Sequence, residues 1–254
     1  MRIDVVMLPS ELTTRHLRGR AVAVFDVLRA TTTMTAALAA GVAEIRLFAD
    51  IEAARSAAAA HAGKRLLVGE VRCLPPEGFE LGNSPGAFNR DLHAGTTMFM
   101  CTTNGTRALL AASEAEAVFA ASLVNCRAVA HRLSDTRRDI TLLCAGTDGK
   151  PALEDLAGAG SVIDALMSSG ESVDLESDIA RCALAVFCAC REDLVGALRV
   201  SQGGRNVIAA GLPQDVDFAA RINTLTNVGR LAPSADVPTL RPAWPPAGDT
   251  TAET

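Results

Sequence analysis

Short apolar runs alternate with alanine-rich segments of helical periodicity, and this alternation limits the possible folds more than any other feature. The runs lie near residues 4–8, 21–27, 44–48, 65–68, 96–101, 117–121 and 140–144. Strands that alternate with helices usually pair in parallel and are covered on both faces. The pattern therefore predicts a three-layer α/β/α fold with a largely parallel or mixed sheet. Asp50 is typical of a helix N-cap, and Gly41 and Gly170 stand where helices are expected to end.

The length of 254 residues is enough for one large α/β domain. We expect this domain to span residues 1–232, and a division into two subdomains near 135–175 is left open. From about Leu175 the pattern is mainly helical, and the apolar run at 182–190 predicts a buried helix that is about half of a membrane span. Five of the eleven prolines lie from Pro233 onward. Residues 233–254 are therefore expected to form a loose C-terminal tail.

The composition argues against several classes of partner. A formal net charge of −5 without a long Lys/Arg run, and only 4% aromatic residues, give no basic patch or stacking surface for nucleic acid or an anionic membrane. The seven cysteines are scattered without a Cys-x-x-Cys pair, which favours reduced thiols, and no signal peptide is recognisable. We expect a cytoplasmic protein that acts on a small molecule. A homodimer is left open.

Polar clusters follow most of the predicted strands. In a sheet of this class, ligands bind beyond the carboxyl ends of the strands. One edge of the sheet is therefore expected to collect these clusters into a single site. They lie at residues 26–33, 69–70, 102–107, 122–125 and 145–150.

The segment 24–33, Val-Phe-Asp-Val-Leu-Arg-Ala-Thr-Thr-Thr, places charge and hydroxyl groups between a strand and a helix. A helix N-terminus has unpaired N–H groups and a partial positive charge, so Thr31, Thr32 and Thr33 are expected to help hold an anion. Asp26 is expected to recruit a metal ion. The alternative is that one threonine caps the helix and Asp26 packs in a turn.

The segment Thr102-Thr-Asn-Gly-Thr106 is typical of a phosphate-binding nest, because Gly105 permits a positive φ that turns consecutive N–H groups inward. An Asn-Gly hairpin is the alternative, and it is disfavoured because residues 107–112 continue as an alanine- and leucine-rich helix. Arg29 and Arg107 are expected to bridge phosphate or sulfonate oxygens. Ordinary surface ion pairs are the competing explanation for these arginines.

Four acids supply the oxygen ligands that Mg²⁺ prefers, and Mg²⁺ is usually bound through one or two carboxylates plus water. They are Asp26, Glu70, Glu154 and Asp155. Acids in a first helical turn also complement the helix dipole, which is a competing explanation for Glu154 and Asp155. The four histidines lie away from the polar clusters, so a Ser-His-Asp triad or a zinc site is disfavoured.

Cys101 and Arg107 have the Cys-x5-Arg spacing of thiol phosphatases, in which one loop presents a thiolate and a phosphate-binding arginine. This spacing is often met by chance. Cys101 also completes an apolar run, so we interpret it as a core residue and keep the thiol phosphatase as an alternative.

Four ordered segments resemble the 2-phosphosulfolactate phosphatase family. They are residues 26–33, 78–85, 102–106 and 144–149; Glu154–Asp155 fits the same pattern, and 201–205 and 215–217 match more weakly. The resemblance implies Mg²⁺-dependent hydrolysis of a phosphate monoester, 2-phosphosulfolactate, to sulfolactate and phosphate, in a pathway that leads to coenzyme M in some organisms. It also draws Asn83 and Ser84 into the site.

The patterns and the resemblance give three sets of candidate residues. The catalytic set is Asp26, Arg29, Glu70 and Arg107. The metal-binding set is Asp26, Glu154 and Asp155. The substrate-binding set is Thr31, Thr32, Thr33, Asn83, Ser84, Thr102, Thr103, Asn104, Gly105, Thr106, Ser122, Asn125 and Gly146.

The sequence departs from the family pattern directly after Glu70. A basic residue followed by glycines is expected there, whereas this chain has Val71, Arg72 and Cys73. A homologue that binds a phosphoester as a sensor or scaffold, without turnover, is the second hypothesis about function. Retention of the acids and of the Thr-Asn-Gly-Thr loop favours the enzyme.

Overall fold

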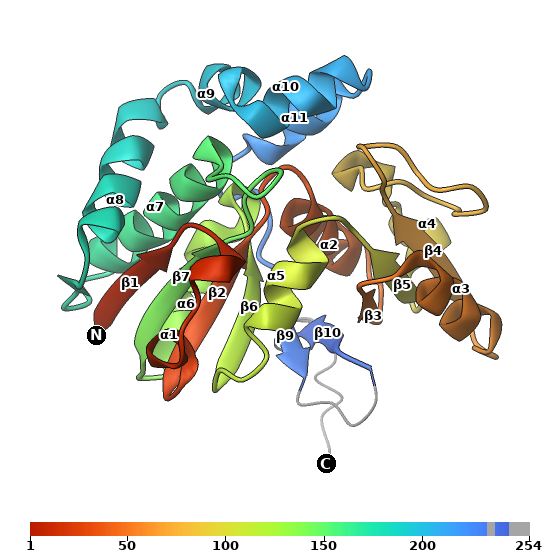
Figure 1. Cartoon of the computed structure of the whole chain (residues 1–254), viewed down its shortest axis with the longest axis horizontal. Coiled ribbons are helices and arrows are strands. Elements are labelled where there is room, and N and C mark those ends of the chain that lie inside the picture. The colour runs from red at the N-terminus through yellow and green to blue at the C-terminus, as the bar shows by residue number, and fades with distance from the viewer. Residues whose placement is uncertain (233–236, 244–254) are drawn as a thin grey trace, which may run out of the picture.

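A ten-stranded mixed sheet forms the centre of the computed structural model, which describes residues 1–232 and 237–243 (Figure 1). Every predicted strand is present, and the α/β/α fold class is confirmed. The strands are β1 Arg2–Val6, β2 Arg20–Phe25, β3 Glu44–Phe48, β4 Arg65–Gly69, β5 Thr97–Cys101, β6 Ala117–Ala121, β7 Asp139–Cys144, β8 Asp174–Leu175, β9 Gly229–Ala232 and β10 Thr239–Pro242.

Helices connect most of the strands, and α8 to α11 follow β8 without further strands between them, as the sequence predicts for this half. Asp50 caps α3, because its carboxylate accepts from the Ala53 N–H at 2.9 Å. The α-helices are α1 Thr14–Leu17, α2 Ala30–Ala39, α3 Ile51–Ala59, α4 Arg90–His93, α5 Gly105–Ala111, α6 Cys126–Asp135, α7 Leu153–Ser168, α8 Asp178–Cys190, α9 Leu194–Val200, α10 Gln202–Ala209 and α11 Pro213–Ala219. Short 3-10 turns are η1 Pro9–Glu11, η2 Pro85–Ala87 and η3 Leu123–Asn125.

Two groups of parallel strands make up the sheet, in the order β4-β5-β3 and β6-β2-β7-β1-β8. Between them lies the β9–β10 hairpin, which pairs antiparallel with β6 on one side and β3 on the other. The two parallel groups therefore run in opposite directions along the sheet. Helices α2 and α5 pack on one face of the sheet and contact residues of both groups. The twist between neighbouring strands adds up across the ten strands and curves the sheet. In Figure 1 the two groups of strands lie on either side of these helices, so the sheet curves around them.

Apolar side chains cover both faces of the sheet. Helices α6, α7 and α8 cover one face, where Phe25 and Phe119 belong to the same buried cluster as Val162 and Leu166 of α7. On the other face, the core joins residues of both strand groups to α2 and α5; its members include Val22, Val24, Met34, Leu38, Ile45, Met98, Met100 and Leu109. The α/β/α layering follows from this double coverage.

Two expectations about the second half differ from the structure. The helix predicted at 182–190 is present as α8, but it is only partly buried. Ala180, Ala183 and Phe187 are buried, whereas Cys182 and Cys188 are exposed. The helical period turns only one face of α8 toward α7. Residues 239–242 of the expected tail form β10, where Leu240 is fully buried. The rest of that tail, 233–236 and 244–254, lies outside the described residues. Over the part of the chain that is described, no helix has the length and apolarity to cross a membrane.

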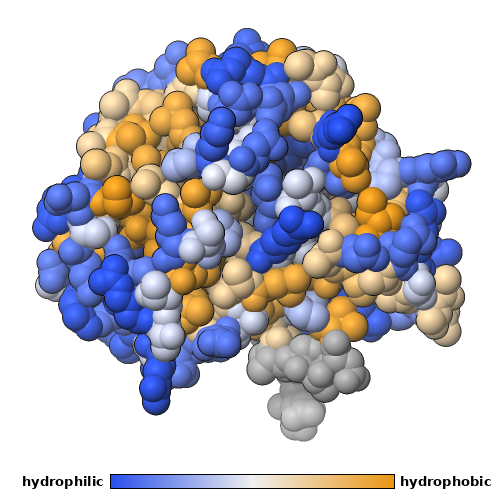
Figure 2. Space-filling view, in the orientation of Figure 1, coloured by the Kyte–Doolittle hydropathy of each residue, from blue (hydrophilic) through white to orange (hydrophobic). Residues whose placement is uncertain are grey.

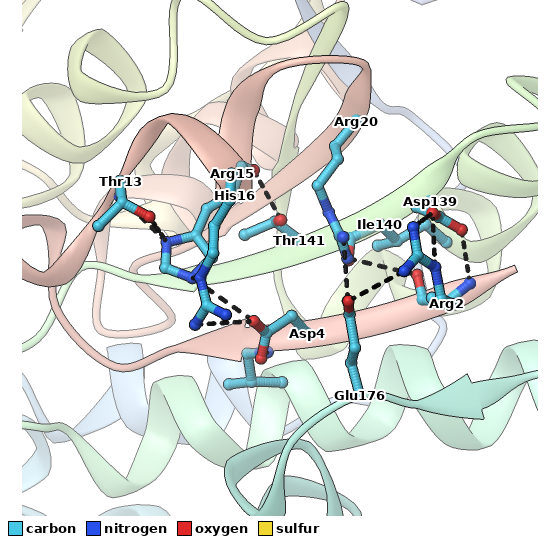
Figure 3. Close-up of polar contacts among 11 residues, drawn as sticks. Arg2, Asp4, Thr13, Arg15, His16, Arg20, Asp139, Ile140, Thr141 and Glu176 are labelled. Atoms are coloured by element: carbon cyan, nitrogen blue, oxygen red, sulfur yellow. Dashed lines mark hydrogen bonds and ion pairs between the residues drawn. The ribbon is translucent and has the colours of Figure 1, made fainter.

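A network of charged side chains links β1, β2, β7 and β8 (Figure 3). Arg2 donates to Asp139 at 2.6 Å, and Arg20 pairs with Glu176 at 2.9 Å. The network lies at the start of β2 and β7, away from the carboxyl ends where the site is expected, so we assign it a structural role.

The face of the molecule in Figure 2 mixes small apolar patches with hydrophilic side chains.

Close packing of α7 against α8 generates the first prediction. A side chain at Gly160 would collide with the main-chain carbonyl of Ala183. Although alanine favours a helix, we expect Gly160→Ala to lower the free energy of unfolding by roughly 1–3 kcal/mol, because overpacking forces the helices apart. Urea denaturation measures this change. Gly86→Ala is the control, since nothing lies near that position, and it is expected to shift stability by less than about 0.5 kcal/mol. Unchanged stability of Gly160→Ala would contradict this packing account.

Candidate active site

The carboxyl ends of four strands meet at one cavity of about 220 Å³. This volume is below the range of pockets that hold drug-sized ligands, so the cavity suits a small molecule. Loops after β2, β4, β5 and β7 contribute, whereas the loop after β6, which was also expected at the site, does not line the cavity. Residues of α10 close the remaining side. The lining residues are Asp26, Leu28, Arg29, Glu70, Val71, Arg72, Cys73, Asn83, Thr103, Asn104, Thr147, Asp148, Gly203, Asn206 and Val207.

Asp26 lies at the junction of β2 and α2, with only 7% of its surface exposed. Its Oδ1 accepts from the Ala30 N–H at 3.1 Å, which caps the first turn of α2. Burial, with the nearby carboxylates of Glu70 and Glu154, raises the pKa of Asp26 to about 6. The start of α5 approaches closely: a Cβ at Gly105 would lie 2.7 Å from Asp26 Oδ2, so only glycine fits there. Gly105 begins α5 and does not have the positive φ that the predicted phosphate nest requires.

The three threonines after Asp26 do not line the cavity, and this corrects their predicted role in anion binding. All three are fully buried. Thr31 donates to the Asp26 carbonyl at 2.9 Å, Thr32 to the Val27 carbonyl at 2.8 Å and Thr33 to the Asn83 carbonyl at 3.1 Å. Their hydroxyls satisfy main-chain acceptors of the surrounding loops, so we remove them from the substrate-binding set.

Glu70 joins the loops that follow β4 and β5. Its Oε1 accepts from the Thr103 N–H at 2.8 Å and its Oε2 accepts from the Cys73 N–H at 3.0 Å. The Thr103 amide, expected in a phosphate nest, therefore points at a carboxylate of the chain itself. The Thr106 N–H is likewise used, by Thr102 Oγ1 at 3.1 Å. Glu70 acts here as a positioning residue.

Arg29 is buried at the cavity and holds three segments together. Its Nη1 pairs with Asp215 of α11 at 2.7 Å, and both side chains are 2% exposed. The same nitrogen donates to Ser84 Oγ at 3.2 Å, and Nη2 donates to the Cys73 carbonyl at 2.6 Å. Ser84 also donates to Asp215 at 2.7 Å. Arg29 and Ser84 thus contribute to a buried polar network, and the charge of Arg29 is balanced by Asp215.

Glu154 and Asp155 open α7, but their surroundings differ. Asp155 accepts from the Val27 N–H at 2.8 Å and from the Gly146 N–H at 2.9 Å, so both of its oxygens hold the loops after β2 and β7 together. Gly146 serves this contact with a φ of 74°. Burial raises the pKa of both acids, and for Asp155 the neighbouring carboxylates of Glu154 and Asp26 add to the effect. Because both of its oxygens accept main-chain N–H groups, Asp155 is a poorer candidate for a metal ligand than Glu154, whose Oε2 has no partner among the described residues.

Two predicted site residues each have a buried oxygen atom without a hydrogen-bond partner in the described part of the chain. These atoms are Glu154 Oε2 and Asn83 Oδ1, and the two residues are 1% and 3% exposed. Buried polar atoms are rarely left unpaired. Asn83 lines the cavity, whereas Glu154 is not among the lining residues, although its carboxylate is close enough to raise the pKa of Asp26. Within the described ranges, no group of three or more His, Cys, Asp or Glu side chains is preassembled for a metal.

Several predicted residues lie away from the cavity. Ser122 contacts Thr32 Oγ1 at 2.9 Å, and Asn125 Nδ2 donates to Thr35 and to the Asn227 carbonyl, so both stabilise the loop after β6. Arg107 is exposed on α5, outside the cavity lining, because the helix turns it toward solvent. Cys101 is buried in β5, and burial raises the pKa of its thiol, which disfavours a thiolate nucleophile.

Sequence reasoning missed part of the lining. Arg72 and Cys73 had been noted only as a departure from the family pattern, and Asp148 only as part of a motif. Asn206 follows the weakly matching segment 201–205, and Asp215 lies in the other weak match. Those weak matches were the signal that could have placed α10 and α11 at the site.

The raised pKa of Asp26 generates a prediction about stability. Its folded pKa of about 6 exceeds its ordinary value of 3.8, so the folded state holds the proton more tightly and stability falls as pH rises from about 4 to 6. In EDTA at pH 8, we expect Asp26→Asn to be more stable than the unsubstituted protein by roughly 1–3 kcal/mol. Thermal melts at pH 8 and pH 4 test this, since the difference should nearly vanish at pH 4. A less stable variant at pH 8 would show that burial does not penalise this carboxylate.

Comparison with known proteins places the chain in a family. A model described as 2-phosphosulpholactate phosphatase matches residues 6–233. A protein of Deinococcus radiodurans named probable 2-phosphosulfolactate phosphatase is 41% identical over 94% of this chain and 96% of its own length. Proteins of the same name from Synechococcus sp. strain JA-3-3Ab and Carboxydothermus hydrogenoformans are 38% and 36% identical, over 87% and 89% of this chain and 91% of their own lengths. The chain belongs to the 2-phosphosulpholactate phosphatase family.

Proposed function

We propose that this chain hydrolyses 2-phosphosulfolactate to sulfolactate and phosphate with the help of Mg²⁺. The observation that carries the proposal is the cavity at the carboxyl ends of the strands. Asp26 and Asn83 line it, the buried Glu154 is close enough to raise the pKa of Asp26, and Asn83 Oδ1 and Glu154 Oε2 have no partner among the described residues. Such oxygens are satisfied by a hydrogen-bond donor or a cation. The family match indicates the substrate class.

The donor set fits Mg²⁺. Mg²⁺ takes oxygen ligands and is usually held by one or two carboxylates together with water and substrate phosphate, so a preassembled group of three acids is not required. We assign Asp26, which lines the cavity, and Glu154, which keeps an unpartnered Oε2, as its carboxylate ligands. We leave out Asp155, which is not among the lining residues and whose two oxygens both hold loops of the chain together. When bound, the ion would offset the negative charge of the phosphate and polarise a phosphoryl oxygen.

The charge balance of the cavity also supports a cation. The lining carries three acids, Asp26, Glu70 and Asp148, against two arginines, one of which is neutralised by Asp215. A phosphate dianion would be repelled by such a lining in the absence of an added positive charge. The side chains of Thr103 and Asn104 line the same cavity and can donate to phosphate oxygens. Glu70 fixes the position of that loop.

Phosphate release tests the proposal. We expect turnover of 2-phosphosulfolactate that EDTA abolishes and Mg²⁺ restores. Asp26→Asn should lower kcat at least roughly a hundredfold, because it keeps the size of the side chain and removes the charge that a hard cation needs. Asp193→Asn is the matched control: Asp193 also accepts a helix N-terminal N–H, from Gly196 at 2.9 Å, but lies outside the cavity lining. Near-normal kcat of Asp26→Asn with an intact melting curve would refute its role.

The sensor hypothesis gives a different outcome in the same assay. A protein that binds 2-phosphosulfolactate in calorimetry, yet releases no phosphate from any small phosphoester with Mg²⁺ present, would be a binding protein. The proposed enzymatic function would then be wrong, while the location of the binding cavity would stand.

A cysteine variant separates metal-assisted hydrolysis from the thiol alternative. Cys101 packs against Leu67 and Phe99 in the core, so Cys101→Ser should retain activity within about tenfold, the loss reflecting a hydroxyl group placed in an apolar strand. A cysteine phosphatase would lose nearly all turnover and would be insensitive to EDTA. A folded but inactive serine variant that still binds substrate would overturn the metal-assisted mechanism.

A further inference from the structure

A tight turn after β4 presents Arg72 to the cavity. Val71 and Leu74 exchange main-chain hydrogen bonds of 2.9 and 3.2 Å, and the two residues between them, Arg72 and Cys73, have φ values of 51° and 69°. This is the pattern of a two-residue hairpin turn with both central residues left-handed, a conformation that usually selects Gly, Asn or Asp. The positions at which the family pattern predicts glycines therefore carry an arginine and a cysteine here.

The turn is anchored on both sides of Cys73. Its N–H donates to Glu70 Oε2 at 3.0 Å, and its carbonyl accepts from Arg29 Nη2 at 2.6 Å. Both anchoring residues line the same cavity. Arg72 is thus carried by a short turn that the site itself holds in place.

Arg72 differs from Arg29, the other cationic side chain of the lining, in having no ion-pair partner among the described residues. Arg29 is buried and paired with Asp215, whereas Arg72 is exposed at the cavity and makes no ion pair or side-chain hydrogen bond with any described residue. Val71, which stands where the family pattern predicts a basic residue, is 48% exposed and apolar. The unpaired positive charge of this lining therefore lies at the tip of the turn.

We propose that Arg72 is a specificity-determining residue that binds a second oxyanion of the substrate, the sulfonate or the carboxylate, while the phosphate lies toward Asp26. This inference rests on the proposed function. The guanidinium group matches oxyanions of both kinds through paired N–H donors, and its charge offsets the acids that dominate the rest of the lining. Arg72 is exposed whereas Asp26 is buried, which favours contact of Arg72 with a group of the substrate other than the phosphate.

Three phosphoesters of increasing charge test the role of Arg72. They are isopropyl phosphate, 2-phospholactate, which adds a carboxylate, and 2-phosphosulfolactate, which adds a sulfonate as well. We expect Arg72→Gly to lower the ratio of kcat/KM for 2-phosphosulfolactate to that for isopropyl phosphate by roughly 10–100-fold, the effect of one charge-assisted contact. If 2-phospholactate loses as much as 2-phosphosulfolactate, the contact is to the carboxylate. If it loses little, the contact is to the sulfonate.

The choice of variant separates this role from folding. Glycine adopts the left-handed conformation at no steric cost, so Arg72→Gly should melt at or above the temperature of the unsubstituted protein. Arg72→Lys, which keeps the charge without the paired donors, should recover part of the discrimination, and Arg18→Ala, an exposed arginine outside the cavity lining, should retain all of it. Equal losses on all three phosphoesters, or no loss on any, would overturn the proposal.

A binding measurement keeps the inference independent of turnover. If the unsubstituted protein hydrolyses none of the three phosphoesters, the proposed function fails. Titration of sulfolactate into the unsubstituted protein and into Arg72→Gly then decides the role of Arg72: roughly tenfold weaker binding by the variant supports it, and equal affinity overturns it.

Discussion

Carboxylates that accept main-chain N–H groups hold the carboxyl ends of the strands together, and the geometry of the site depends on them. Asp26 caps α2, Glu70 ties Thr103 and Cys73 to the end of β4, and Asp155 ties the loops after β2 and β7. Buried N–H groups must be paired, and a charged acceptor makes a stronger bond than a neutral one. The acids of the site are therefore part of the framework as well as of the proposed chemistry.

This arrangement places like charges close together in a region of low exposure. Burial raises the pKa of Asp26, Glu154 and Asp155, so the cluster resists carrying its full negative charge. The buried Arg29–Asp215 pair adds no net charge. A cation bound at Asp26 and Glu154 would relieve this repulsion, which links the stability of the metal-free protein to the proposed function of the site. Active-site residues commonly lower the stability of a folded protein in this way.

The topology explains why one small cavity receives loops from distant strands. The β9–β10 hairpin reverses the direction of the sheet between its two parallel groups, and the sheet wraps around α2 and α5. The end of β5 thereby meets the end of β2, with Gly105 against Asp26. The contact demands glycine at that position, so the Thr-Asn-Gly-Thr loop serves the close approach of two chain segments as well as contact with a ligand.

The sequence alone determined the strands, most helices, the α/β/α layering and four of the loops that line the cavity, because hydrophobic periodicity and polar strand ends are local signals. Tertiary structure decided which polar side chains face the cavity. Thr31, Thr32, Thr33, Ser122 and Asn125 are equally polar in the sequence, yet all of them bond to other groups of the chain. Thr31 and Thr32 bond to carbonyls five residues earlier, and Thr33, Ser122 and Asn125 bond to segments far apart in the sequence. The position of β10, the pairing of Arg29 with Asp215 and the exposure of Arg72 at the cavity likewise depend on segments far apart in the chain, which no local pattern records.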